Sequence, residues 1–157
     1  LPASSSIMHS SFSRCRLFVF SFIDASLRSS YPTLYSSAFT KKFFQDGEIS
    51  PKAFEKALVA ARKELSGIAN TYKNEGWDTV VGSSGTIKAC RQIIVNMGWS
   101  DEKESLTRDG LDKLKDKLFK YKHVSDMEFD GLKEDRRAVL PAGIAILYAV
   151  FDVLEIA

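Results

Sequence analysis

The segment from Ala138 to Ile156 restricts the fold of this chain more than any other stretch. Pro141 occupies a position typical of the first turn of a helix, where its missing N–H costs nothing. The apolar residues that follow lie on nearly every side of that helix: Ile144, Ile146, Leu147, Val150, Phe151, Val153 and Leu154. Because Asp152 and Glu155 interrupt the run, it falls short of the roughly 18 apolar residues of a membrane span. We therefore expect a helix buried between other elements.

A long amphipathic helix is predicted to begin at Ser50-Pro51 and to end at Gly76. Serine followed by proline is a helix start, and glycine is a common left-handed cap. The apolar residues recur at steps of three and four: Phe54, Ala57, Leu58, Ala61, Leu65, Ile68 and Tyr72. The charged residues fall largely on the other face: Lys52, Glu55, Lys56, Arg62 and Lys63. This pattern indicates one buried and one solvated face.

Two shorter helices are predicted between this helix and the last one. The first carries Ile87, Ile93, Ile94 and Met97 and is closed by Gly98. The second is capped by Thr107 and directs Leu111, Leu114 and Leu118 inward. Its lysines lie mostly outward: Lys113, Lys115, Lys117 and Lys120. With Lys122 they are either a track for a polyanion or an ordinary solvated face interleaved with Asp112 and Asp116.

Composition divides the chain near Thr40, into residues 1–40 and residues 41–157. The first part is rich in serine and poor in charge, and residues 1–38 contain no glycine. Its apolar stretch Leu17–Ile23 follows Arg14 and Arg16, which is the order of a secretory signal, but it is short and lacks a cleavage site. We expect an aromatic strand or disordered low-complexity sequence there.

The bulk properties exclude several classes of protein. The 157 residues suit one domain, and the formal charge of +2 argues against a dedicated nucleic-acid coat. Cys15 and Cys90 form no paired pattern, so neither a disulfide framework nor a zinc site is indicated, and a reducing compartment is expected. His9 and His123 have no metal-ligand spacing.

The feature with most chemical content joins the predicted strand 78–81 to the helix behind it. This turn is glycine-rich and carries hydroxyl groups and a lysine: Gly82, Ser83, Ser84, Gly85, Thr86 and Lys88. Glycines admit a ligand close to the main chain, and the following helix offers unpaired N–H groups and a positive dipole end. The spacing matches neither the P-loop nor the dinucleotide fingerprint. A turn that needs glycine only for packing remains the alternative.

A second candidate is the run Asp135-Arg136-Arg137. An arginine binds phosphate oxygens in a two-point fashion, so Arg136 is a candidate phosphate ligand. The alternative is a solvated loop, in which an arginine pairs with Glu134 or Asp135 and contributes only about 0–1 kcal/mol.

Several blocks, in order, resemble the Ppx/GppA family of exopolyphosphatases and guanosine pentaphosphate phosphohydrolases. They are residues 76–89, residues 131–137, residues 141–147, Phe151-Asp152 and the helix after Ile49-Ser50. The resemblance covers residues 39–157, about three quarters of the chain.

The resemblance implies an α/β fold, namely part of an actin-like, ribonuclease-H-like ATPase fold that is helix-rich and incomplete here. Residues 41–157 would be a fragment of the second of its two domains. The turn at 82–86 would face the cleft between two such domains, and Arg136 would lie near the phosphate or guanosine-phosphate ligand. The family reaction removes a terminal phosphate by water attack with the help of magnesium. Its carboxylates and main phosphate loop have no counterpart in this chain, so we assign no catalytic and no metal-binding residue.

We therefore expect a fragment of a cytoplasmic exopolyphosphatase, inactive alone, with guanosine pentaphosphate hydrolysis as the alternative. A disrupted gene, read in an altered frame before Thr40, would explain the serine-rich segment. The expected partners are polyphosphate or guanosine pentaphosphate, a second copy in a homodimer, and a membrane surface contacted peripherally, but no nucleic acid. The rival from another class is a helical interaction domain without enzymatic activity.

Overall fold

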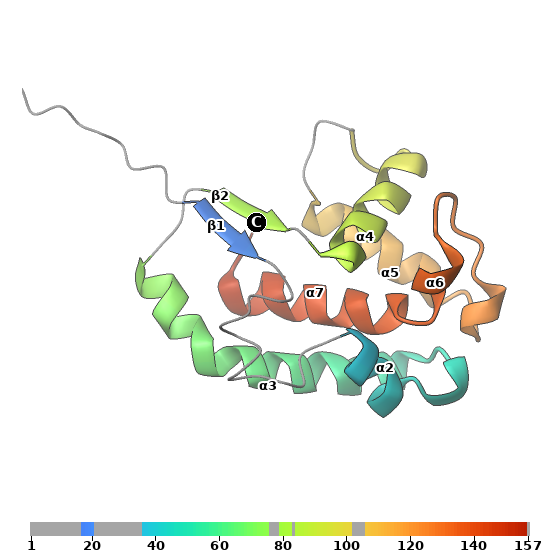
Figure 1. Ribbon diagram of the computed structural model, residues 1–157, viewed down its shortest axis with the longest axis horizontal. Helices are drawn as coiled ribbons and strands as arrows, with labels where there is room; N and C mark the ends of the chain where they lie inside the picture. The colour runs from blue at the N-terminus through green and yellow to red at the C-terminus, as the bar shows by residue number, and fades with distance from the viewer. Residues whose placement is uncertain (1–16, 21–35, 76–78, 83, 102–105, 157) are drawn as a thin grey trace, which may run out of the picture.

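A computed structural model describes residues 17–20, 36–75, 79–82, 84–101 and 106–156. Helix α7 (Leu140–Leu154) lies at the centre of the helices, as Figure 1 shows. Helix α3 (Pro51–Glu75) runs along one side of it and makes the most extensive contact with it. Helices α4 (Gly85–Asn96) and α5 (Arg108–Leu118) cover the other side, and α2 (Ser36–Phe43) packs near the start of α7.

The burial of α7 confirms the expectation drawn from its sequence. Every residue of this helix except Asp152 and Val153 is buried. The helix begins one residue before Pro141, which occupies its first turn. An apolar helix of this kind needs neighbours on all sides, and the four surrounding helices supply them.

Helix α3 buries the face that its periodicity predicts. Phe54, Ala57, Leu58, Ala61 and Leu65 are each at most 6% exposed. The ring of Phe54 meets those of Phe119 and Tyr148 edge to face, with centroids 5.2 and 6.0 Å apart. Such aromatic pairs add to the stabilisation from burial. Gly76, the predicted cap, lies outside the described residues.

The end of α4 before Gly98 and the start of α5 after Thr107 lie where the sequence predicts, whereas α4 begins at Gly85, within the predicted turn. The Ser84 hydroxyl accepts a hydrogen bond from the Ile87 N–H at 3.2 Å, and Thr107 does the same for Gly110 at 3.1 Å. Each cap satisfies one of the amides that a helix start leaves unpaired. Gly98 follows α4 with a φ of +68°, as a glycine cap requires.

Asp152, the charged residue inside α7, holds three helices together. Its carboxylate accepts hydrogen bonds from Arg62 of α3, at 3.0 Å from Nε, and from Arg108 of α5, at 2.5 Å from Nη1. Burial opposes ionisation of this carboxyl, but the hydrogen bonds from the two arginines outweigh it, so the pKa of Asp152 lies below its ordinary value. Arg108 also lies over the ring of Tyr148, 4.5 Å from its centroid.

The described strands form a small parallel pair. Strand β1 (Leu17–Phe20) pairs with β2 (Thr79–Gly82), with Leu17 opposite Thr79 and Phe20 opposite Gly82. The aromatic stretch near the start of the chain therefore contains a strand, one of the two expected outcomes. Short 3-10 turns, η1 (Gln45–Gly47) and η2 (Val124–Asp126), complete the connections.

The expected polar connection from Gly131 to Arg137 contains one regular element, the single helical turn α6 (Glu134–Arg137). No helix in the described part of the chain is both long and apolar enough to cross a membrane.

Candidate functional site

The predicted glycine corner is the junction of β2 and α4. Gly82 ends the strand, Ser84 caps the helix, and the helix begins at Gly85, so Gly85 and Thr86 belong to its first turn. Gly82 and Gly85 are exposed, so the corner reaches the surface of the described structure. Ser83 lies outside the described residues.

The guanidinium of Arg136 lies directly against Gly85. A β-carbon placed on Gly85 would be 2.9 Å from Nη1 and 3.0 Å from Cζ of Arg136. The absence of a side chain at Gly85 is what admits the arginine to the first turn of α4. Two candidates taken separately from the sequence, 51 residues apart, are thus brought to one place.

Arg136 also carries the ion pair that the alternative interpretation foresaw. Its Nε is 3.5 Å from a carboxylate oxygen of Asp135, and its side chain is 43% exposed. Arg137 points elsewhere, with its Nε 3.2 Å from Glu134 and its Nη1 3.4 Å from the carbonyl oxygen of Ser125. Such an exposed pair is weak, so the guanidinium of Arg136 keeps donors for a second acceptor.

Lys88 and Thr86 take opposite positions in the first turn of α4. Lys88 is exposed and stands one turn after Gly85, on the same side of the helix. Thr86 is only 6% exposed, and its hydroxyl oxygen is 3.2 Å from that of Ser36. The hydroxyl of Thr86 therefore faces a protein partner instead of the open corner.

Gly143 of α7 explains why Thr86 can be buried. A β-carbon on Gly143 would lie 2.1 Å from the methyl carbon of Thr86, so only glycine allows α4 to approach α7 this closely. Gly82 has a comparable packing role, since a β-carbon there would lie 2.7 Å from Ile87 Cδ1. The packing interpretation therefore holds for Gly82, whereas Gly85 faces a cation.

Helix α2 adds a residue that the sequence analysis missed. Ser36 is the first residue of α2, and its bond to Thr86 brings the starts of two helices together beside Arg136. Helix starts carry partial positive charge, so their convergence favours an anion. A serine just before the apolar Ala38 and Phe39 is a possible helix start. Ser36 could not be singled out as one, because the segment around it contains many serines.

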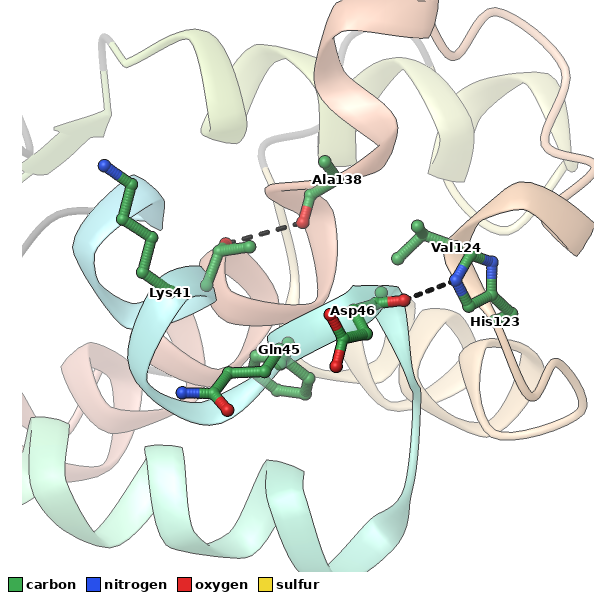
Figure 2. Close-up of a pocket in the computed structure, with 9 residues that line it drawn as sticks. Lys41, Gln45, Asp46, His123, Val124 and Ala138 are labelled. Carbon is green, nitrogen blue, oxygen red and sulfur yellow. Dashed lines mark hydrogen bonds between the residues drawn. The ribbon is translucent and has the colours of Figure 1, made fainter.

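A separate shallow groove of about 520 Å³ lies along the second half of α2 and η1 (Figure 2). Its labelled lining residues are Lys41, Gln45, Asp46, His123, Val124 and Ala138. The Thr40 hydroxyl donates to the carbonyl oxygen of Ser36 at 2.6 Å and also lies 3.4 Å from the carbonyl oxygen of Ala138, the residue after α6.

His123 closes the far end of the groove. Its Nδ1 accepts from the Ser125 N–H at 3.1 Å, so its Nε2 carries the proton that it donates to the carbonyl oxygen of Asp46 at 2.5 Å. The imidazole thus links η1 to η2 through hydrogen bonds and has a structural role.

Magnesium does not fit the residues gathered at the corner. This ion takes oxygen ligands, with one or two carboxylates in most protein sites. The described candidates are two glycines, a capping serine, a buried threonine, a lysine and an arginine: Gly82, Gly85, Ser84, Thr86, Lys88 and Arg136. Within the described ranges, no group of three or more His, Cys, Asp and Glu side chains is placed to hold a metal. The corner can bind an anion through N–H groups and cations.

Comparison with known proteins finds relatives that match most of the chain. The model of the Ppx/GppA phosphatase family matches residues 36–157, beginning five residues before the boundary expected from composition. A guanosine-5′-triphosphate,3′-diphosphate pyrophosphatase of Vibrio vulnificus is 36% identical over 116 residues, which are 74% of this chain and 23% of that protein. A protein of Haemophilus influenzae described as an exopolyphosphatase is 38% identical over 119 residues, 76% of this chain and 36% of that protein. The chain thus spans between about a quarter and a third of the length of these curated relatives.

Proposed function

The chain belongs to the Ppx/GppA phosphatase family, and from that premise we propose that residues 36–157 supply one phosphate-binding wall of an exopolyphosphatase. The observation that carries the proposal is the contact between the Arg136 guanidinium and Gly85 at the start of α4. It combines a fork of N–H donors with a helix start and the nearby Lys88, and each of these favours phosphate oxygens.

In this proposal the wall holds the phosphate chain and offsets charge that develops on its oxygens. Arg136 donates two parallel hydrogen bonds to one phosphoryl group, and the first-turn amides of α4 donate to the same anion. Lys88 adds a point charge one helical turn away. Hydrogen-bond donors that are held in place before the reaction lower its barrier most when they point at atoms whose negative charge increases in the transition state.

No residue of this chain is assigned as the base that activates water, and no step is assigned to magnesium. We propose that the chain by itself releases little or no phosphate. Guanosine pentaphosphate is the alternative substrate, because relatives bear both names. The actin-like fold, magnesium, the cytoplasm, the homodimer and the peripheral membrane contact stay predictions.

The proposal is tested by titrating the 157-residue protein with inorganic tripolyphosphate at two salt concentrations and measuring the heat of binding by calorimetry. Arg136→Gln and Lys88→Gln are each expected to weaken binding about ten-fold, since a hydrogen bond to a charged group contributes about 1.5–3 kcal/mol. Binding to the unmodified protein should weaken as salt rises.

The matched controls are Arg137→Gln, whose guanidinium forms an ion pair with Glu134 and donates to the carbonyl oxygen of Ser125, and Lys56→Gln on the exposed face of α3. Both should bind tripolyphosphate normally. Equal losses in the controls, or binding that ignores Arg136, would refute the assignment of this wall.

A further inference from the structure

A second groove, of about 600 Å³, lies past the end of α4 and along α5. Two aromatic rings and a thioether line it, from Trp99, Tyr121 and Met97. Three lysines line it as well: Lys113, Lys117 and Lys120. We call it the lysine–aromatic groove. Its volume lies within the roughly 300–1,000 Å³ of small-molecule sites.

The aromatic residue Trp99 is fixed by the end of α4. Gly98 takes a φ of +68°, its N–H bonds the carbonyl of Val95 at 2.9 Å, and the N–H of Trp99 bonds that of Ile94 at 3.0 Å. This closing pattern holds the residue after the glycine in one place relative to the helix. The main chain of Trp99 is therefore positioned before any ligand arrives.

Tyr121 is held from two directions. Its ring meets that of Phe129 edge to face with centroids 5.6 Å apart, and its hydroxyl donates to the carbonyl oxygen of Glu128 at 3.2 Å. Rings that are already ordered cost little entropy on binding, which favours affinity.

The structure separates the five lysines near α5 into two groups. Lys113 and Lys117 lie one turn apart on α5, Lys120 follows the end of that helix, and all three line the groove. Lys115 instead lies over the Tyr148 ring, 4.8 Å from its centroid, and Lys122 does not line the groove. The lysines therefore do not form one continuous track.

The balance of charge in the groove is positive. Asp116 is the acidic residue that lines it, against three lysines. Lys113 is partly neutralised by Asp109, 2.8 Å away, while the ammonium of Lys117 lies 3.8 Å from the sulfur of Met97. Neither contact fully satisfies an ammonium group with three donors.

We propose that the lysine–aromatic groove binds a nucleoside phosphate, with the base against Trp99 and Tyr121 and the phosphates at Lys113, Lys117 and Lys120. An inorganic phosphate chain would use the lysines but not the rings, and an apolar segment would use the rings but not the lysines. A nucleotide uses both, since bases stack on aromatic side chains and cations hold the phosphates.

This site is separate from the one that carries the proposed function. Helix α4 lies between them, and its 12 residues rise about 18 Å. A single mononucleotide cannot bridge that distance while its base stays in the groove. The groove is open to solvent, so the expected affinity is weak and falls with added salt.

Amide and indole chemical shifts of the 15N-labelled 157-residue protein test the proposal, with ATP, AMP, adenosine and tripolyphosphate as probes. ATP should perturb Trp99 and Tyr121 and bind more tightly than AMP or adenosine. Tripolyphosphate should perturb these residues much less and act instead at Gly85 and Lys88, so each site reports independently.

Variants sharpen the assignment. Lys113→Gln and Lys120→Gln are each expected to weaken ATP binding about two- to five-fold, as for exposed charge pairs. Lys122→Gln, a matched exposed lysine outside the groove, should leave it unchanged. Trp99→Leu should abolish the preference for ATP over tripolyphosphate at these residues.

Three results would overturn the proposal. Tripolyphosphate could perturb the groove as strongly as ATP, Lys122→Gln could weaken ATP binding as much as Lys120→Gln, or a single-stranded oligonucleotide could bind where ATP does not.

Discussion

Replacing Asp152 by asparagine tests how much the charged junction inside α7 contributes to stability. The carboxylate is 23% exposed and accepts hydrogen bonds from Arg62 on one side and Arg108 on the other. Asparagine has nearly the same shape but no charge, and its NH₂ group would face guanidinium donors. The variant therefore removes the charge without creating a cavity.

The expected loss lies between two limits. Exposed ion pairs contribute about 0–1 kcal/mol, whereas breaking a buried pair costs about 3–5 kcal/mol. Here the acid is mostly buried but Arg62 and Arg108 are 41% and 39% exposed, so solvent screens both partners. We expect Asp152→Asn to lower the free energy of unfolding by about 2 kcal/mol.

Urea unfolding followed by circular dichroism measures this loss as a shift of about 1 M in the midpoint. The pH dependence gives an independent check. Since the folded pKa of Asp152 is below its ordinary value, its contribution is present above the unfolded pKa of about 4 and is lost as pH falls through the folded pKa. The difference in the free energy of unfolding between the unmodified protein and Asp152→Asn should therefore disappear in acid.

Glu155→Gln is the matched control. It also neutralises an acid near the end of α7 that pairs with a base of α3, Lys73, but the Glu155 side chain is 77% exposed. Its loss should stay below about 0.5 kcal/mol. If Asp152→Asn is no more destabilising than this control, or if its deficit is the same at neutral pH and in strong acid, the reasoning about the junction is wrong.

Three further outcomes follow from close contacts. Gly143→Ala should destabilise the fold by about 1–3 kcal/mol in urea, because the new β-carbon would lie 2.1 Å from the Thr86 methyl carbon inside a packed contact; an unchanged midpoint would contradict the close approach of α4 to α7. Gly85→Ala should leave the midpoint nearly unchanged but weaken tripolyphosphate binding, because the new β-carbon would displace the Arg136 guanidinium that lies against it; normal binding would contradict this. In a Cys15→Ser background, Cys90 should resist iodoacetamide at pH 8 until urea is added, since burial raises the pKa of its thiol to about 12; mass spectrometry detects any native labelling.

The helices could be predicted because each rests on local signals. The steps of Phe54, Ala57 and Leu58 and the caps Ser50 and Thr107 involve residues that are neighbours along the chain. These signals fix where a helix begins and which face it buries, without reference to the rest of the molecule.

The assembly of the candidate site could not be predicted in the same way. The contact of Arg136 with Gly85, and that of Ser36 with Thr86, join residues 50 or more apart in the chain. They depend on how closely α4 approaches α7, which Gly143 decides, and a lone glycine inside an apolar helix gives no sign of its partner.

The two sides of the corner differ in how firmly they are built. Helix α4 is anchored by the buried Thr86, whereas Arg136 rides on the single turn α6, which buries none of its residues. Elements with so few buried contacts open at little cost in free energy. An anion would then bind between the firmly anchored start of α4 and the more loosely held Arg136. Its observed affinity would scale with the fraction of molecules in which Arg136 already lies against Gly85. Substitutions that stiffen α6 would tighten binding without touching the ligand.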